Sequence, residues 1–247
     1  MSTKKVTRWI ANRLKYGIGE KGRERKLAAK KERRANKFES ERWKRDGELA
    51  RRQYANYDEY IEHQGAKLDQ IMHRLRETEQ EDFDDFKNRF EQCQALSEAR
   101  SVLCLGARLG TEVAAMHALG HFAVGIDLNP GKDNAYVLPG DFHAIVFPDE
   151  SVDAVYTNVM DHVFDLDKVM AEISRLLPPG GLFIADLIQG YEEGFTPGEF
   201  EATHWANTDD FMQKLCTLTG FEVIEDRMVG QRRNNTWRQV VFRKPGQ

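Results

Sequence analysis

Hydrophobic positions over residues 99–130 fall into short continuous runs and one longer segment with helical spacing. Residues 102–105 form an apolar run, as expected of a strand buried on both faces of a parallel sheet. Residues 111–119 carry the broad apolar face of a helix, and residues 122–126 form a second run that ends at Asp127. This stretch therefore predicts a strand, a glycine turn, a helix and a second strand.

The same kind of pattern continues to the end of the chain. The further predicted elements are a strand near 136–138, a strand over 152–157, a helix from about 165 to 177, a strand over 182–187, a helix from 208 to 219, and final strands over 221–229 and 237–242. A loop over 191–206 is expected to lie over the site formed by these elements. Strands that alternate with helices predict an α/β fold whose mostly parallel sheet has helices on both faces.

Residues 53–97 precede this domain and show helical spacing of a different kind. Their aromatic residues recur every three or four positions, first at Tyr54, Tyr57 and Tyr60, then at Phe83, Phe86 and Phe90. Such stripes most simply make core or docking contacts, so we expect helices that cap the α/β domain. A cap of this kind can also form one wall of a ligand pocket.

Residues 1–52 differ from the rest of the chain in charge. They contain 19 Lys and Arg against 7 Asp and Glu, whereas residues 53–247 contain 17 against 33. Val6, Ile10 and Leu14 give this segment one apolar stripe on a basic helix, a pattern that can lie on an anionic membrane surface. The leading interpretation is a solvated arm, helical or partly disordered. Contact with a membrane surface or another polyanion, or with RNA, stays open, although the segment has no RNA-binding motif.

The chain of 247 residues is thus predicted to divide into an arm (1–52), a helical cap (53–97) and an α/β domain (98–247). Its three cysteines, Cys93, Cys104 and Cys216, are widely spaced and show no metal-ligand pattern, which favours free thiols in a reducing cytosol. We find no run near the length of about 20 apolar residues that crosses a bilayer, and no hydrophobic core of a signal peptide. These features predict a cytoplasmic protein, with a peripheral place at the inner face of a membrane as the alternative.

The glycine turn after the first strand discriminates between nucleotide-type ligands. Gly106 and Gly110 bracket the turn, but the dinucleotide fingerprint also requires glycine at positions held by Arg108 and Thr111. A pyrophosphate therefore lacks the close backbone approach that it needs. S-adenosylmethionine (SAM) has no phosphate and tolerates a bulkier turn. Asp127 lies where a unit of this type places the acceptor for ribose hydroxyls.

Motifs downstream of Asp127 follow one another in a diagnostic order. They are Gly140-Asp141-Phe142, Phe147-Pro148-Asp149, Asp161-His162-Val163 and Pro179-Gly180-Gly181. Over residues 101–186 this series resembles the class I SAM-dependent methyltransferases, especially their branch acting on small molecules and sugars. The resemblance implies a Rossmann-like, seven-stranded, mostly parallel sheet with SAM as cofactor. It also implies methyl transfer to a hydroxyl or amine of a small molecule or sugar, including a surface-glycan precursor.

The resemblance further implies where the cofactor binds. The residues it indicates are Gly106 and Gly110 through their backbone, Asp127 with Leu128 at the ribose, Asp141 with Phe142 at the adenine, and Asn158 at the methionine part. Two positions depart from the family pattern, because Cys104 replaces an acid and Arg108 replaces a glycine. We expect Glu112 to contact the methionine ammonium and Arg108 its carboxylate. The alternative is a degenerate methyltransferase that binds SAM weakly.

His162 is the predicted general base, because a histidine of near-neutral pKa can take a proton from a hydroxyl. His143 and His204 are fallback candidates. Residues in predicted loops near the acceptor are Tyr191, Phe195, Trp205 and Arg232 or Arg233. No divalent-metal cluster is predicted.

Two further functions remain open at this stage. One is an RNA or protein methyltransferase that uses the basic arm, and the other is a non-catalytic binding protein that keeps the fold. The expected partners are a small-molecule or glycan acceptor and, through the cap helices, a second copy of the chain.

Overall fold

The computed structural model describes residues 15, 19–40, 42–232 and 235–246. At its centre lies a seven-stranded sheet of order β5-β4-β3-β6-β7-β10-β9. Its strands are β3 (Ser101–Leu105), β4 (Phe122–Asp127), β5 (Val137–Pro139), β6 (Ala154–Thr157), β7 (Leu182–Ile188), β9 (Glu222–Arg232) and β10 (Asn235–Arg243). The strands from β3 to β7 pair in parallel, and β10 runs antiparallel to both of its neighbours. The predicted seven-stranded, mostly parallel sheet is confirmed.

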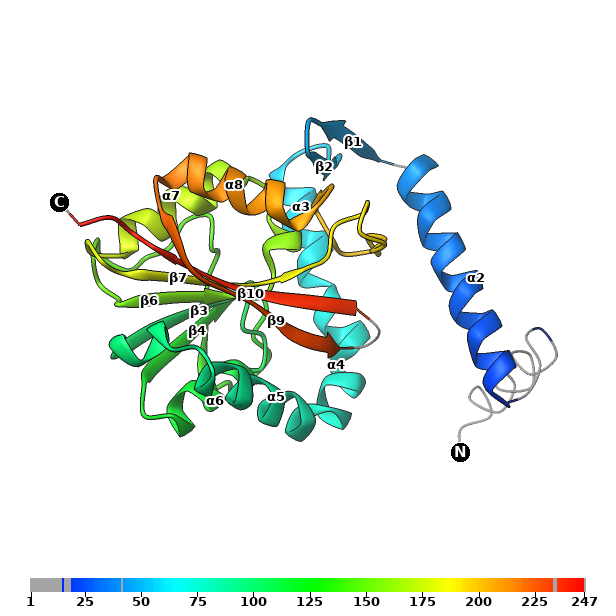
Figure 1. Ribbon diagram of the computed structural model, residues 1–247. Coiled ribbons are helices and arrows are strands. Elements are labelled where there is room, and N and C mark those ends of the chain that lie inside the picture. The colour runs from blue at the N-terminus through cyan, green and yellow to red at the C-terminus, as the bar shows by residue number, and fades with distance from the viewer. Residues whose placement is uncertain (1–14, 16–18, 41, 233–234, 247) are drawn as a thin grey trace.

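Helices cover both faces of this sheet (Figure 1). On one face lie α7 (Leu166–Leu176) and α8 (Thr208–Thr219), and on the other lie α5 (Glu79–Glu91) and α6 (Thr111–Ala118). Every residue of β7 is buried, as the continuous apolar run predicts for a strand covered on both faces. Local signals set the helix ends: the Asp165 side chain accepts from the backbone N–H of Lys168 to begin α7, and Gly220 in the left-handed region ends α8.

The cap helices α3 (Tyr57–Gly65) and α4 (Lys67–Glu77) lie at the carboxyl ends of the parallel strands. The hydroxyl of Tyr60, which is fully buried, donates to the backbone carbonyl of His162, 3.1 Å away. Asn129, just beyond β4, donates to the backbone carbonyl at the end of α3. Of the helices predicted between residues 53 and 97, α3 and α4 therefore cover the edge of the sheet where α/β proteins bind ligands.

A buried polar network joins α5 to the sheet. The guanidinium of Arg89 donates to Oδ2 of Asp186 on β7 at 2.7 Å. The hydroxyl of Tyr156 donates to the same oxygen at 2.8 Å, and the Gln239 amide donates to Oδ1 at 2.9 Å. The side chain of Asp186 is completely buried. Its charge is therefore stabilised by these three donors rather than by water.

A small second sheet was not predicted from the sequence. It contains β1 (Trp43–Asp46), β2 (Leu49–Arg52) and β8 (Thr203–Trp205), in that order. The sequence pattern places residues 43–52 in the arm and residues 203–205 in a loop. Leu49 is buried because it pairs with Trp205, a partner far along the chain that a local pattern cannot reveal.

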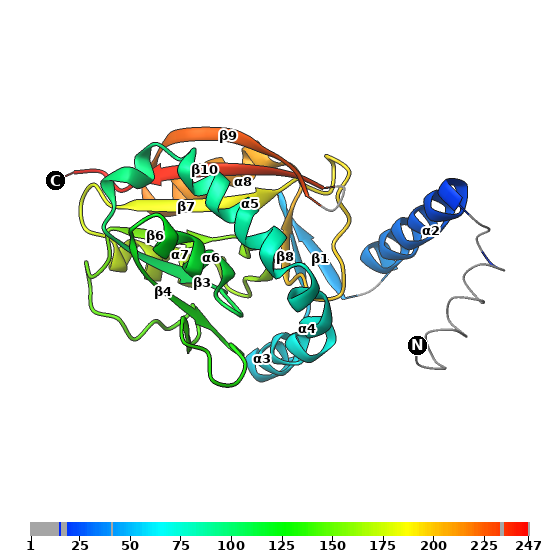
Figure 2. The same ribbon diagram turned by 90° about the horizontal axis from the view of Figure 1, so that it is seen from below.

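The basic helix α2 (Gly19–Ser40) runs as a separate rod beside the cap helices and the loop after β7 (Figures 1 and 2). Its C-terminal end is attached through Phe38, a buried residue whose ring lies 5.1 Å from Trp43 and 5.3 Å from Tyr191. This confirms the predicted helical N-terminal extension. The predicted stripe of Val6, Ile10 and Leu14 lies outside the described residues. None of the described helices combines the length and apolar character required to cross a membrane.

Candidate functional site

The turn after β3 contains the two predicted glycines, and both have positive φ angles, 71° at Gly106 and 82° at Gly110. A Cβ atom at Gly106 would lie 2.4 Å from a methyl group of Val159, and one at Gly110 would lie 2.7 Å from Cβ of Tyr136. Packing alone therefore requires glycine at both positions. Arg108 also has a positive φ, 46°, so the turn keeps its shape where the family pattern has another glycine.

Asp127 closes this turn from the end of β4. Its Oδ2 accepts the backbone N–H of Arg108 at 3.1 Å, and its Oδ1 accepts that of Asn129 at 2.8 Å. A carboxylate has about four acceptor positions, so each oxygen can accept a further bond. These two acceptor oxygens fit a ribose, whose two hydroxyls would donate to them.

A narrow cleft of about 50 Å³ runs beside Asp127. It brings together five residues that the sequence assigns to the cofactor: Gly106, Arg108, Asp127, Leu128 and Phe142. Side chains of α3 and α4, including Tyr60 and Leu68, line its other side. Its volume has room for only a few water molecules. A carboxylate beside apolar side chains suits the nucleoside part of SAM. Because the cleft is so narrow, the nucleoside can enter only when the side chains of α3 and α4 move outward.

Asp141 lies next to the cleft and is already hydrogen-bonded. Its Oδ1 accepts the backbone N–H and the ring Nδ1 of His143, each at 2.8 Å, and its Oδ2 accepts the hydroxyl of Tyr57. Burial opposes ionisation, but the hydrogen bonds from His143 and Tyr57 outweigh it and lower the pKa of Asp141 to about 2. The adenine contact of Asp141 stays a prediction, because much of its acceptor capacity holds α3 in place.

A larger cavity, about 620 Å³ in volume, adjoins the cleft. Its sheet side contains Gly106, Arg108, Glu112, Asn158 and His162, all of which the sequence assigns to the site. Its other sides are formed by α2, by α4 and by the loop over residues 194–201. The contacts of Glu112, Arg108 and Asn158 with the methionine part stay predictions, and the cavity places all three on one wall. Cys104 is buried within β3, outside this wall.

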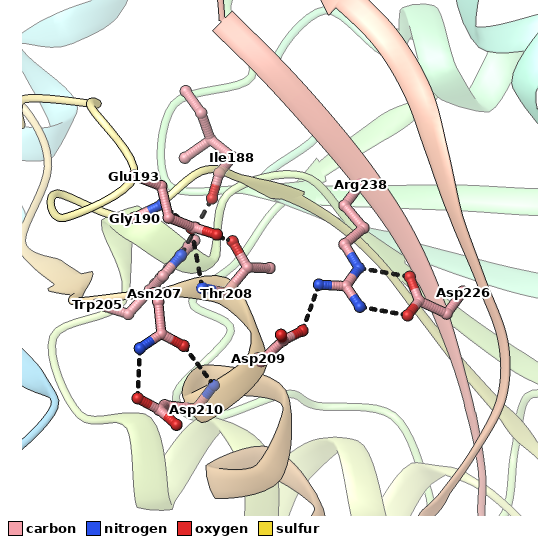
Figure 3. Close-up of polar contacts among 10 residues, drawn as sticks. All are labelled: Ile188, Gly190, Glu193, Trp205, Asn207, Thr208, Asp209, Asp210, Asp226 and Arg238. Atoms are coloured by element: carbon pink, nitrogen blue, oxygen red, sulfur yellow. Dashed lines mark hydrogen bonds and ion pairs between the residues drawn. The ribbon is translucent and has the colours of Figure 1, made fainter.

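The loop after β7 is fixed at its base and at its tip. At the base, a carboxylate oxygen of Glu193 accepts the backbone N–H groups of Gly190 and Thr208, at 2.6 and 2.9 Å (Figure 3). At the tip, the Arg52 guanidinium on β2 donates to the carbonyls of Gly198 and Glu201, at 2.7 and 2.8 Å. The loop is therefore held over the cavity, as the sequence predicts.

His162 and Lys67 form a hydrogen-bonded pair in the cavity wall. Nζ of Lys67 lies 2.7 Å from Nε2 of His162, whose Nδ1 lies 2.7 Å from the carbonyl of Phe200. Nδ1 must donate to that carbonyl, so Nε2 accepts from Lys67. Burial and the charge of Lys67 lower the pKa of His162 well below its usual value. His162 is therefore neutral, with both ring nitrogens engaged, and cannot accept a substrate proton in this arrangement.

Lys67 is a functional candidate that the sequence did not reveal. Burial, and next the charge of Arg108, lower its pKa to about 7, against the attraction of Asp161 and Glu201. Burial and the charge of Glu201 raise the pKa of Asp161. Lys67 is one lysine among many in the N-terminal half, and no motif surrounds it. Only its place at the start of α4, opposite the motif residues, identifies it.

The remaining candidates have other places. His143 holds Asp141, and His204 is completely buried, which lowers its pKa to about 3. Neither is among the described residues that line the cavity. Phe195 does line it, whereas Trp205 is buried and donates to the carbonyl of Ile188 (Figure 3). Tyr191 packs on Phe38, and the side chains of Arg232 and Arg233 lie outside the described part of the chain.

Known proteins match this arrangement. Residues 103–185 match the family model of a methyltransferase domain. The Burkholderia thailandensis 1,6-didemethyltoxoflavin-N1-methyltransferase, solved with bound 1,6-didemethyltoxoflavin and S-adenosylhomocysteine, is similar in fold at 17% identity, with a TM-score of 0.62 over 83% of this chain and 100% of that one. A putative methyltransferase solved with the *Haloferax volcanii* Trm112 activator is also similar, at 17% identity and a TM-score of 0.57 over 74% and 98%.

The family match covers the strands and turns that form the cleft. The order of the motifs agrees with it. Together these findings show that residues 103–185 match a methyltransferase domain and that the chain has the fold of SAM-dependent methyltransferases.

Proposed function

We propose that the protein methylates a hydroxyl or amine of a small molecule or sugar, and that Lys67 accepts the proton that the acceptor loses. One observation carries this proposal. Lys67 and His162 line both the narrow cleft and the large cavity, together with the turn residues Gly106 and Arg108. The boundary between a cofactor cleft and an acceptor cavity is where a methyl group must pass.

SAM, when bound, supplies a methyl group already activated by a sulfonium. The protein therefore contributes mainly alignment, which supplies a large part of the lowering of the barrier in reactions of this kind. Asp127 and Leu128 would hold the nucleoside, and the loop held by Arg52 would enclose the acceptor. The acceptor atom gains the methyl group and its proton passes to the neutral amine of Lys67. His162 orients that amine, and the nearby Asp161 favours the ammonium that forms.

The size of the cavity supports a small acceptor. Its volume of about 620 Å³ lies within the range of about 300–1,000 Å³ typical of small-molecule sites. A surface-glycan precursor remains the candidate that the motifs suggest. The proposal also includes a cytoplasmic location. Membrane or polyanion contact through residues 1–45 and a homodimer through the cap helices stay predictions.

A labelling experiment tests this function without knowledge of the acceptor. The protein is incubated with SAM carrying a labelled methyl group and with a cell extract divided into fractions below and above about 1 kDa. We expect labelled product in the small fraction only. Label in RNA or protein would favour the macromolecular alternatives, and no label in either fraction would favour a non-catalytic binding protein.

The role of Lys67 is tested once an acceptor is known. Lys67→Met should lower kcat about 10²- to 10⁴-fold, the usual contribution of a general base, whereas Lys168→Met on the exposed side of α7 should not. The wild-type profile of kcat/KM should fall as the pH drops below about 7, where Lys67 becomes protonated. Asp161→Asn removes an attraction for the ammonium and should move this limb to lower pH. A wild-type limb well below pH 6 would exclude Lys67 as the base.

A further inference from the structure

One face of α2 forms a wall of the large cavity. The residues that line it are Leu27, Lys30, Lys31 and Arg34, at positions i, i+3, i+4 and i+7. Residues with this spacing share one side of a helix. Three of the four are cationic. The cavity therefore faces a positively charged stripe, although the helix carries charges around most of its circumference.

A further cation approaches this stripe from α4. Arg74 lines the same cavity, and its charge reaches Lys30. The charge of Arg34, burial and the charge of Arg74, in that order, lower the pKa of Lys30. Like charges held together in this way repel one another, and an anion placed between them relieves the repulsion.

Arg34 also reaches the loop that covers the cavity. A Cβ atom at Gly198 would lie 3.0 Å from the Arg34 guanidinium and 2.9 Å from Oε2 of Glu201. Gly198 is thus the residue that lets this side chain approach the loop. Because Arg52 holds the same loop from β2, Arg34 is placed at a fixed part of the cavity wall rather than in open solvent.

Acidic residues line the cavity too, and they restrict where an anion can bind. Asp82, Glu199 and Glu201 are among the lining residues, and Asp82 accepts a hydrogen bond from Thr78. Glu201 exerts its charge on Lys67 and Asp161, near the cleft. An anionic group therefore fits against the cationic stripe of α2, and the reacting end of the acceptor reaches toward Lys67.

We propose that the stripe formed by Lys30, Lys31 and Arg34 binds a phosphate or diphosphate group of the acceptor. This proposal rests on the proposed function and specifies its substrate class: a phosphorylated small molecule whose hydroxyl or amine is methylated. Several cationic donors that converge from two helices suit a group with three or more charged oxygens. The phosphate can belong to a soluble sugar phosphate or to a lipid headgroup that presents the sugar.

The opposite face of α2 offers a matched control. At about 100° per residue, Lys21 and Arg25 lie roughly opposite the stripe. The test pair Lys30→Gln/Arg34→Gln and the control pair Lys21→Gln/Arg25→Gln remove the same charges from the same helix. A non-specific basic arm would respond equally to both.

Calorimetry on the full chain tests the proposal in two steps. S-adenosylhomocysteine is titrated first, and this step alone tests the cofactor site of the proposed function. Inorganic pyrophosphate and then glucose 1-phosphate are titrated into the loaded protein. We expect the test pair to weaken both at least tenfold while leaving S-adenosylhomocysteine affinity within twofold, and the control pair to change them less than twofold.

Two further ligands complete the design. Phosphatidylcholine vesicles with and without phosphatidic acid replace the soluble phosphates, and binding that only the test pair abolishes assigns the phosphate to a lipid headgroup. A twelve-nucleotide oligouridylate is the second ligand and serves as the RNA probe. The proposal is overturned if pyrophosphate, glucose 1-phosphate and the phosphatidic acid vesicles all fail to bind the loaded wild type. Equal losses of phosphate affinity in the test pair and the control pair would also overturn it. So would oligouridylate binding that is tighter than phosphate binding and is weakened equally in both pairs, and either result would favour RNA contact.

Discussion

The two walls of the large cavity are built in different ways. The sheet wall consists of turns that follow buried parallel strands, and its side chains are held by backbone hydrogen bonds, as Asp127 is. The helical wall consists of α2, α4 and the loop after β7. Its cations are carried on a helix whose large apolar contact is Phe38, near one end.

Under the proposed function, this difference separates the two tasks of the enzyme. The sheet wall contains the motifs that many methyltransferases need for one shared cofactor. The helical wall lies outside the family match, which spans residues 103–185, and under the same proposal it selects the acceptor. Binding sites on a rigid scaffold commonly place their variable part in attached segments of this kind.

The largest expected effect comes from breaking the buried polar network that joins α5 to the sheet behind the sheet wall, at Arg89. Arg89→Met leaves the carboxylate of Asp186 buried without its cation and should lower the free energy of unfolding by about 3–5 kcal/mol, measured in urea. In the Arg89→Met/Asp186→Asn variant no buried charge remains, so its loss should be clearly smaller than the sum of the two single losses. A cost below about 1 kcal/mol for Arg89→Met would show that this pair does not anchor α5 to the sheet.

A smaller effect sharpens the role of the sheet wall. Asp127→Asn keeps one acceptor oxygen but loses the charge, so S-adenosylhomocysteine should bind about 10- to 100-fold more weakly, as expected from charged hydrogen bonds of about 1.5–3 kcal/mol. Asp133→Asn, the same change in the exposed part of the following loop, is the control and should bind normally. Calorimetry measures both. Unchanged affinity in Asp127→Asn would remove Asp127 from the cofactor site.

The smallest effect concerns the contact between the cap and the sheet wall. Tyr57→Phe removes one donor to Asp141 and should cost about 1 kcal/mol at neutral pH. Because hydrogen bonds depress the pKa of Asp141 to about 2, their contribution is full above its unfolded pKa of about 3.9 and is lost as the pH falls toward 2. The free energies of unfolding of Tyr57→Phe and the wild type should therefore converge in acid. Tyr54→Phe is the control, because the wild-type Tyr54 hydroxyl pairs with His63 within the cap and not with Asp141. Its difference in stability from the wild type should not shrink as Asp141 becomes protonated.

The sequence predicts the sheet wall far better than the helical wall, for a physical reason. Buried parallel strands are continuous apolar runs, and the turn at Gly106 and Gly110 requires glycine whatever ligand it binds, so both leave local signals. The pairing of Leu49 with Trp205 and that of Arg89 with Asp186 join distant positions, and no local pattern encodes them. Lys67 is an ordinary helical lysine in the sequence. Its chemistry arises from burial and from Arg108, which only the fold supplies.

The pairing of β2 with β8 has a consequence for the order in which the molecule forms. A nascent chain that has emerged only as far as β7 contains β5, β4, β3, β6 and β7, which can pair with one another. The hairpin of β1 and β2 is synthesised much earlier, yet it must wait for β8 before it is covered. Contacts so distant in sequence form slowly, because a long loop must close first. Arg52 on β2 holds the loop of the helical wall, so we expect this loop to be fixed late. Hydrogen exchange during refolding should protect β2 later than β3.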